Sequence, residues 1–255
     1  MISVVIPTLN AETTLLRCLA ALVTGAVEGV VREVIVADGG STDATVKIVD
    51  QAGAQWHRAE RGRGKQIASG LALTRGNWIL VLHADTILEP GWEAEAMEFI
   101  ERVETGRRRE AAAVFRYALD DEGTMPRLVE TLVNVRTRML GLPYGDQGLL
   151  ISRRLYNEVG GYKPMGLMED VDIVRRLGRR RLTTLRSRAI TSAERYRREG
   201  YLKRIARNQS CLAMYYAGVP VERIARFYNG SPLVADELRP DDANEAAGRS
   251  DANPS

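Results

Sequence analysis

The fold is decided by residues 77–86, NWILVLHADT. Within this stretch an unbroken apolar run from Trp78 to Leu82, preceded by a glycine, leads into a polar cluster that begins at His83. A short apolar run of this kind is typical of a strand buried on both faces, as in a parallel sheet. In open α/β sheets, ligands bind at the carboxyl ends of the strands. We therefore expect Asp85, just beyond this strand, to lie at a functional edge.

The composition indicates an ordinary globular protein. Of 255 residues, 45% are apolar and 27% are charged. No stretch approaches the roughly 18 apolar residues of a membrane-spanning helix, and the N-terminus enters a strand pattern without a basic leader, so we expect a cytoplasmic protein. Cys18 and Cys211 lie in separate apolar helical patterns, which favours buried thiols over a disulfide or a metal site.

Strand and helix patterns alternate along the chain. Strands are predicted at residues 3–6, 33–37, 54–58, 78–82, 111–117 and 149–152. Helices are predicted at residues 11–23, 44–51, 90–103, 126–140 and 168–177. Another predicted helix follows RGRGK and ends at residue 73, and two more lie on either side of GlyValPro at 218–220. This order predicts an α/β fold, with a mostly parallel sheet flanked by helices and a C-terminal helical extension. We predict a single domain over residues 1–230 and a disordered acidic tail over residues 235–255.

Acidic side chains recur where predicted strands end or helices begin. Asp38 and Asp85 follow strands, and Glu169 and Asp170 start a helix. For Asp38 alone, a turn or cap role is an equal alternative. Because such positions converge on one edge of a parallel sheet, together they suit a divalent cation that takes oxygen ligands.

The motifs resemble those of inverting family 2 glycosyltransferases of the GT-A fold, over residues 2–177. The matching segments are VVIPTLN at 4–10 followed by Glu12, DGGSTD at 38–43, GK at 64–65, HADT at 83–86 and EDVD at 169–172. HADT, GDQG at 145–148 and MED at 168–170 are similar, more narrowly, to a small bacterial subgroup found beside radical SAM genes and proposed for arsenosugar-type biosynthesis.

This resemblance implies a pocket for a nucleotide-sugar donor, most simply a UDP-sugar. Its expected lining residues are Pro7, Thr8, Asn10, Glu12, Asp38, Gly39, Lys65, His83, Ala84 and Asp85. Asp38 would contact uracil or ribose, and Lys65 the nucleobase or phosphates. Residues 1–117 would form the nucleotide-binding half, 118–194 the acceptor and catalytic half, and 195–230 the C-terminal helices.

The resemblance also implies the chemistry. Asp85 would hold Mn²⁺ or Mg²⁺ against the diphosphate, and Asp170, beside Glu169, would take the proton from an unknown acceptor hydroxyl. Such parts suit the reaction, because a cation stabilises charge on the leaving group and a carboxylate base activates a weak nucleophile.

One departure from the family pattern concerns His83. The family usually has Asp-x-Asp where this chain has His83-x-Asp85. His83 would ligate the metal or bond a phosphate oxygen, or else it is a structural histidine that orients Asp85. His57 has no acidic neighbour in sequence and is predicted to be structural.

Two glycine-containing segments have alternative interpretations. RGRGKQ at 61–66 fails both the P-loop and the dinucleotide patterns, although Gly62 could receive phosphate or form a plain tight turn. In GDQG, Asp146 and Gln147 are candidate binders of sugar or acceptor hydroxyls, with a turn motif as the alternative.

A basic run extends from Arg175 to Arg207, with 13 basic residues against two glutamates. A solvated face is the default interpretation. A peripheral contact with anionic lipid, or with a lipid-linked acceptor, is the functional one. Arg195 loosely matches the arginine of a family element that contacts the diphosphate, whereas no module for binding nucleic acid accompanies the charge. Rival functions are a nucleotidyltransferase of similar fold and a catalytically weak nucleotide-binding or scaffold protein.

Overall fold

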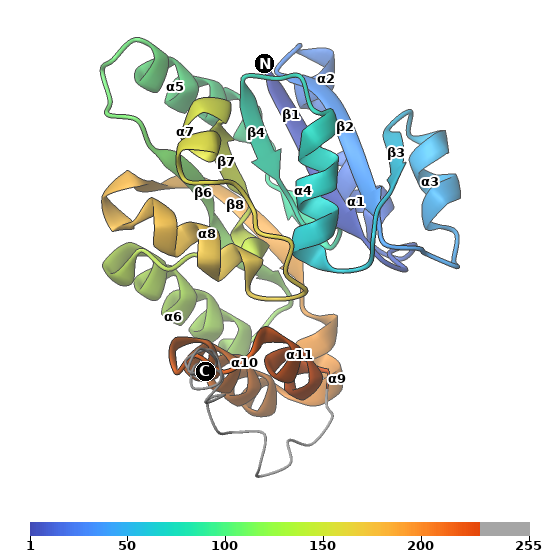
Figure 1. Cartoon of the computed structure of the whole chain (residues 1–255), viewed down its shortest axis with the longest axis vertical. Coiled ribbons are helices and arrows are strands. Elements are labelled where there is room, and N and C mark those ends of the chain that lie inside the picture. Colours follow the sequence, from blue (N-terminus) through green and yellow to red (C-terminus); the bar gives the residue numbers. More distant parts are fainter. Residues whose placement is uncertain (230–255) are drawn as a thin grey trace, which may run out of the picture. The chain divides into compact units, whose positions relative to one another are not determined.

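The computed structural model describes residues 1–229, which divide into a first unit, residues 1–201, and a second unit that begins at Leu202. The first unit is built on one eight-stranded sheet with the order β3-β2-β1-β4-β7-β6-β8-β5 (Figure 1). Its strands are β1 Ile2–Thr8, β2 Val31–Asp38, β3 Gln55–Arg58, β4 Trp78–Val81, β5 Thr86–Leu88, β6 Ala112–Asp120, β7 Leu149–Ser152 and β8 Leu182–Ser192. Strands β3, β2, β1 and β4 are parallel to one another, as predicted.

The strand β4 is buried on both faces, as its apolar run indicates. Because side chains alternate along a strand, Trp78 and Leu80 belong to one core cluster and Ile79 and Val81 to the other. In the first cluster, Trp78 packs edge-on against Phe99 at 5.8 Å between ring centroids. The strand thus joins two hydrophobic cores, and its carboxyl end is fixed from both sides.

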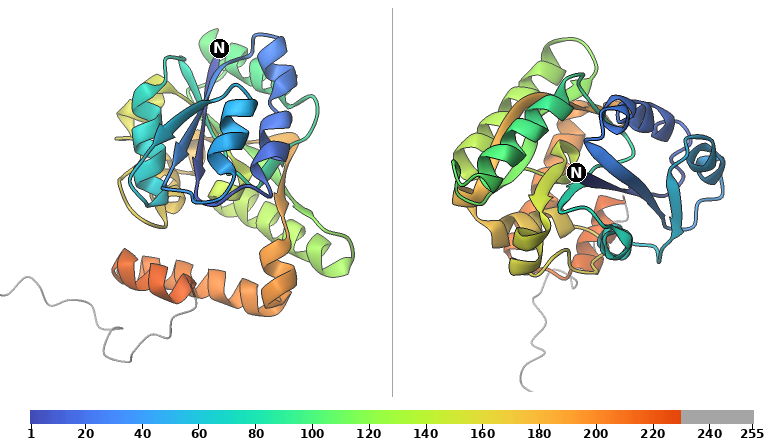
Figure 2. Two further views of the ribbon diagram at one scale, coloured as in Figure 1. Left: turned by 90° about the vertical axis from the view of Figure 1, so that its right-hand side faces the viewer. Right: turned by 90° about the horizontal axis from the view of Figure 1, so that it is seen from above.

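Helices of the first unit cover both faces of the sheet (Figure 2). One core cluster takes residues from α1 Leu15–Ala20, α3 Thr45–Gln51 and α5 Trp92–Glu104. The other takes residues from α4 Arg63–Leu73, α7 Arg153–Glu158 and α8 Glu169–Leu177. The predicted helix over residues 11–23 is divided, because α1 ends at Ala20 and a short helix α2, Val23–Val27, follows it. Both cysteines are buried and free, as predicted.

The second half of the sheet is mixed. Strand β7 is antiparallel to β4, and β6 is antiparallel to β7 at a single pair, Ala113 with Leu150. Strand β8 is parallel to β6 over its length, and β5 is antiparallel to β8. The sequence did not predict β5 or β8. In β8, buried residues such as Leu185 and Ala189 are separated by arginines. The sequence of the strand therefore resembles a charged segment and lacks a clear apolar pattern.

The second unit is helical. The helix α10, Tyr201–Tyr216, starts at the boundary of the units, and α11, Val221–Tyr228, follows the predicted break at 218–220. A short helix α9, Glu194–Glu199, precedes the boundary. Within residues 1–229 no helix combines the length and the apolar character needed to span a bilayer. The predicted acidic tail lies outside the described residues.

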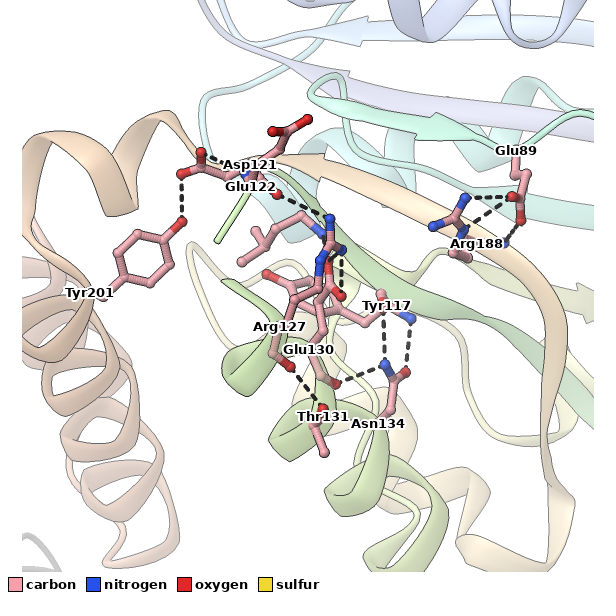
Figure 3. A network of polar contacts seen from close by, with 11 residues as sticks. Glu89, Tyr117, Asp121, Glu122, Arg127, Glu130, Thr131, Asn134, Arg188 and Tyr201 are labelled. Carbon is pink, nitrogen blue, oxygen red and sulfur yellow. Dashed lines mark hydrogen bonds and ion pairs between the residues drawn. The ribbon is translucent and has the colours of Figure 1, made fainter. Parts of the chain in front are cut away.

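Side chains of α6, Thr124–Leu140, form hydrogen bonds with backbone groups of β6 that no neighbouring strand within residues 1–229 pairs (Figure 3). The Asn134 amide accepts a hydrogen bond from the Tyr117 N–H and donates one to the Tyr117 carbonyl, both at 3.0 Å. The Leu119 N–H donates to the Glu130 carboxylate at 2.8 Å. Since β6 leaves β7 after one pair, these side chains take the place of a neighbouring strand.

The hydrogen bonds of Asn134 with β6 predict that its substitution destabilises the fold. We expect Asn134→Ala to lower the free energy of unfolding by about 1–3 kcal/mol, because it leaves the backbone groups of buried Tyr117 without partners. The control is Thr131→Ala on the same helix, whose hydroxyl donates to the Arg127 carbonyl of that helix. Urea unfolding measures the stability of both variants. Equal losses of unfolding free energy would contradict the role of Asn134 in bonding the β6 backbone.

Candidate active site

The end of β4 is anchored through its backbone. The His83 carbonyl accepts from the Thr86 N–H at 3.1 Å and from the buried Cys18 thiol at 3.4 Å. The Ser192 N–H donates to the Asp85 carbonyl at 3.0 Å. The half-buried Ala84 lies between these fixed residues. The side chains of His83 and Asp85 therefore leave a rigid strand end at the edge where β1 and β2 also finish.

The loops after β1 and β2 are bonded to each other. Asn10, in a left-handed conformation with φ 52°, accepts a hydrogen bond from the Thr42 N–H at 2.9 Å through its side chain. The Glu12 carboxylate accepts from the Ala44 N–H at 2.9 Å. Asn10 and Glu12 thus hold the second loop in place, next to Pro7, which is buried in β1.

Asp38 is only 1% exposed, and its carboxylate is occupied by its own turn. It accepts from the Thr8 hydroxyl at 3.1 Å and from the N–H groups of Gly40 and Ser41 at 3.1 and 2.9 Å. This is the turn role that was the alternative for Asp38. The contact of Asp38 with uracil or ribose stays a prediction.

The Gln66 side chain closes the same region from α4. Its amide donates to the carbonyls of Thr8 and Ala37 at 2.6 and 2.9 Å, and Gly39 packs against it. The neighbouring Lys65 forms an ion pair with Glu60. The first half of the site is therefore an ordered pair of loops over the ends of β1 and β2.

A second group of predicted residues meets around the 3₁₀ turn Gly145–Gln147. His83 Nδ1 lies 3.1 Å from Asp146 Oδ1, and the Gly145 N–H donates to Asp170 Oδ2 at 2.7 Å. A Cβ at position 145 would collide with the His83 ring, so only glycine permits this approach. Both ring nitrogens of His83 consequently face the turn.

Asp146 and Gln147 have different roles in this turn. The Asp146 side chain is 45% exposed. Burial alone would raise its pKa, but the hydrogen bond with His83 and the electrostatic effects of His83, Arg63 and Arg195 lower the pKa to about 2. Gln147 is fully buried, and its amide is bonded to the Thr137 hydroxyl and the Phe115 carbonyl. Of the two, only Asp146 can reach a ligand.

Glu169 is fully buried, and few polar contacts compensate the burial of its carboxylate. Neither carboxylate oxygen has a hydrogen-bond partner among the described residues, and Oε1 lies 3.6 Å from Arg63 Nε. Burial raises the pKa of Glu169 to about 7, against the lowering effect of Arg63 and with a further increase from Asp170. Asp170 itself is half-buried at the start of α8, and its Oδ1 accepts from the Val171 N–H.

Arg63 is the main residue that sequence reasoning missed. It reaches Glu169 because the start of α4 is fixed by Gly64, whose N–H donates to the Met165 carbonyl at 2.9 Å. A Cβ at Gly64 would collide with the Lys163 carbonyl. The alternating glycines of RGRGK were the available signal, since they allow this close backbone approach.

Asp85 differs from the other acids of the site. Within residues 1–229 no hydrogen bond or ion pair engages its half-buried carboxylate, whereas those of Asp38, Asp146 and Asp170 are all engaged. The same residues contain no group of three or more His, Cys, Asp or Glu that could hold a metal ion.

Solved structures define the class of this fold. The chain is similar to glucosyl-3-phosphoglycerate synthase from Mycobacterium tuberculosis, with 23% identity, a TM-score of 0.53, and coverage of 75% of this chain and 70% of that chain. It is also similar to residues 1–349 of TarS from S. aureus, with 16% identity, a TM-score of 0.58, and coverage of 89% and 69%. The sheet and its flanking helices are thus the GT-A fold, as the motifs predicted.

The family follows from the sequence itself. The profile described as glycosyl transferase family 2 matches residues 3–158. The chain therefore belongs to that family. No curated protein matches the chain.

The buried Glu169 predicts a pH-dependent stability. Its folded pKa of about 7 exceeds that of an exposed glutamate, so the stability it contributes is complete in acid and is lost as the pH rises through 7. We expect Glu169→Gln to match wild type near pH 4 and to exceed it at pH 8 by at most roughly 3 kcal/mol. Thermal unfolding across this range measures the difference, with the exposed Glu28→Gln as control. Parallel curves for wild type and Glu169→Gln would contradict it.

Proposed function

We propose that the protein transfers one sugar from a UDP-sugar to an acceptor hydroxyl, with inversion at the anomeric carbon and with help from a divalent cation. The observation that carries this proposal is that an unengaged carboxylate, Asp85, follows β4, while the Asp170 carboxylate is held by the Gly145 N–H, beside the His83 ring. Solved structures similar to this chain support it. One holds Mn²⁺, UDP-glucose and phosphoglyceric acid, and another holds UDP-GlcNAc.

The donor would bind over residues 1–117. Hydrogen bonds of Asn10, Glu12 and Asp38 order the loops after β1 and β2, so these loops would form a preorganised binding surface, or floor, for the nucleoside. In this assignment these three residues act through the loops they hold. A preformed floor matters because ordering loops during binding would consume part of the binding free energy.

A Mn²⁺ or Mg²⁺ ion fits Asp85. Its carboxylate is a hard oxygen ligand at a strand end that is fixed through the backbone, and an ion bound there would also take phosphate oxygens of the donor as ligands. When bound, the ion would offset charge on the departing diphosphate. His83 would keep Asp146 in place, since its ring faces the turn. Arg195, whose charge reaches Asp146, would add a positive group near the diphosphate.

Asp170 would act as the base that takes the proton from the acceptor. The N–H groups of Gly145 and Val171 orient its carboxylate, so that its remaining lone pairs have a fixed direction. Glu169 has no exposed surface and would therefore act by positioning, through its ion pair with Arg63. The half-exposed Asp146 would accept a hydroxyl of the sugar or of the acceptor. Residues 118–194 would thus form the acceptor and catalytic half.

Two variants separate donor binding from transfer. We expect Asp85→Ala to lose Mn²⁺-dependent stabilisation by UDP-sugars, and Asp170→Asn to keep that stabilisation while turnover falls by about 10²- to 10⁴-fold. Melting temperatures and hydrolysis across a panel of sugar nucleotides measure both effects. The exposed Asp50→Asn on α3 is the matched control.

Full activity in both variants would refute the mechanism. Stabilisation by sugar nucleotides without turnover in wild type, across all donors and acceptors tried, would instead favour a nucleotide-binding scaffold. Release of pyrophosphate from nucleoside triphosphates would favour a nucleotidyltransferase.

A further inference from the structure

A groove of about 1080 Å³ runs between α6 and the strands β6 and β8. None of the acidic residues of the candidate active site lines it. Figure 3 shows part of its lining, with Arg127 and Glu130 on α6 and Arg188 on β8. Its charged lining residues are one acid, Glu130, and six arginines, Arg116, Arg127, Arg138, Arg179, Arg186 and Arg188.

A bulge in β8 aims one of these arginines. Along β6, Val114 pairs with Thr184 and Arg116 with Arg188, so β8 contains two extra residues between the pairs. Leu185 is buried in the core, while Arg186 is exposed and lines the groove. Such bulges redirect side chains and are specific features of a strand.

The bulge is held by an acid from outside the groove. The Glu95 carboxylate accepts from the N–H groups of Arg186 and Ser187 at 2.7 and 2.8 Å. The position of the Arg186 backbone is therefore built into the fold.

The groove carries uncompensated positive charge. Arg127 pairs with Glu130 at 2.6 Å, and Arg188 pairs with Glu89 at 2.7 Å. In the part of the chain that the structure describes, no hydrogen bond or ion pair engages the guanidinium groups of Arg138 and Arg179. An anionic surface is therefore the complementary partner.

An apolar stripe on α6 adjoins this charge. Leu128, Leu132, Val135 and Met139 are spaced by four, three and four residues, which places them on one face of the helix. Their exposed fractions are 47% to 60%, although the opposite face of α6 is already buried against the sheet. A continuous exposed stripe of this kind marks an interaction surface.

We propose that α6 and the groove arginines dock the protein on an anionic phospholipid membrane. The apolar stripe would enter the acyl boundary, while the arginines would contact phosphate groups beside it. A second copy of this chain is a poorer partner, because a twofold contact would oppose the two sets of arginines. Nucleic acid would use the arginines and leave the stripe exposed.

This docking surface modifies the prediction made from the basic run Arg175 to Arg207. Arg179, Arg186 and Arg188 of that run line the groove, and the apolar part comes from α6, which lies outside the run. The docking proposal is independent of glycosyl transfer, because binding to a membrane needs neither donor nor acceptor.

Vesicle flotation of the full chain without nucleotide tests the docking. Vesicles of phosphatidylcholine alone are compared with vesicles that also contain phosphatidylglycerol. We expect binding only to the anionic vesicles, weakened by salt, and weakened at least about tenfold in Leu132→Ser/Met139→Ser and in Arg138→Glu/Arg179→Glu.

Matched controls make comparable chemical changes elsewhere in the first unit. Leu16→Ser/Val27→Ser removes two exposed apolar side chains, and Lys47→Glu/Arg58→Glu reverses two exposed charges near the other end of the sheet. Both controls should bind within about twofold of wild type.

Three results would overturn the proposal. The first is absence of binding to anionic vesicles by folded wild-type protein. The second is an equal loss of binding in the control variants. The third is concentration-dependent dimerisation that Leu132→Ser/Met139→Ser abolishes without any vesicle binding by wild type, which would make the stripe a contact between copies.

Discussion

The candidate site depends on the contact between the His83 ring and Gly145. The ring lies where a Cβ would be at position 145, and the same glycine donates its N–H to Asp170. The end of β4, the turn before β7 and the start of α8 are therefore fixed to one another. Asp85 and Asp170 come from sequence segments 85 residues apart, yet the distance between them is set by this contact and by the two cores that β4 joins.

The strand at the centre could be predicted from sequence because its signal is local. An apolar run is sufficient to indicate burial on both faces, and MetGluAsp before an amphipathic run indicates the start of α8. Strand β8 could not be predicted, since one of its faces is exposed and carries arginines while its partner β6 lies some 70 residues away in sequence. Its pairing is a tertiary effect that no local pattern records.

For the site residues, too, the sequence predicts location better than bonding. A sequence can indicate that Asp38, Asp85 and Asp170 gather at one edge, but it cannot show which carboxylate is already bonded. The Asp38 carboxylate is taken by backbone N–H groups of its own turn, whereas that of Asp85 is unengaged within residues 1–229. This difference is what separates a residue that holds a loop from one that can meet an ion. Arg63 was missed because its partner Glu169 is more than 100 residues away in sequence.

The most direct measurement is the position of Mn²⁺ in crystals grown with UDP. Anomalous scattering locates the ion without reference to activity. Direct contact of the ion with the Asp85 carboxylate and the diphosphate is the predicted result, with the His83 ring still against Gly145. An ion held by Asp146 or Asp38, with Asp85 not involved, would contradict the assignment of Asp85.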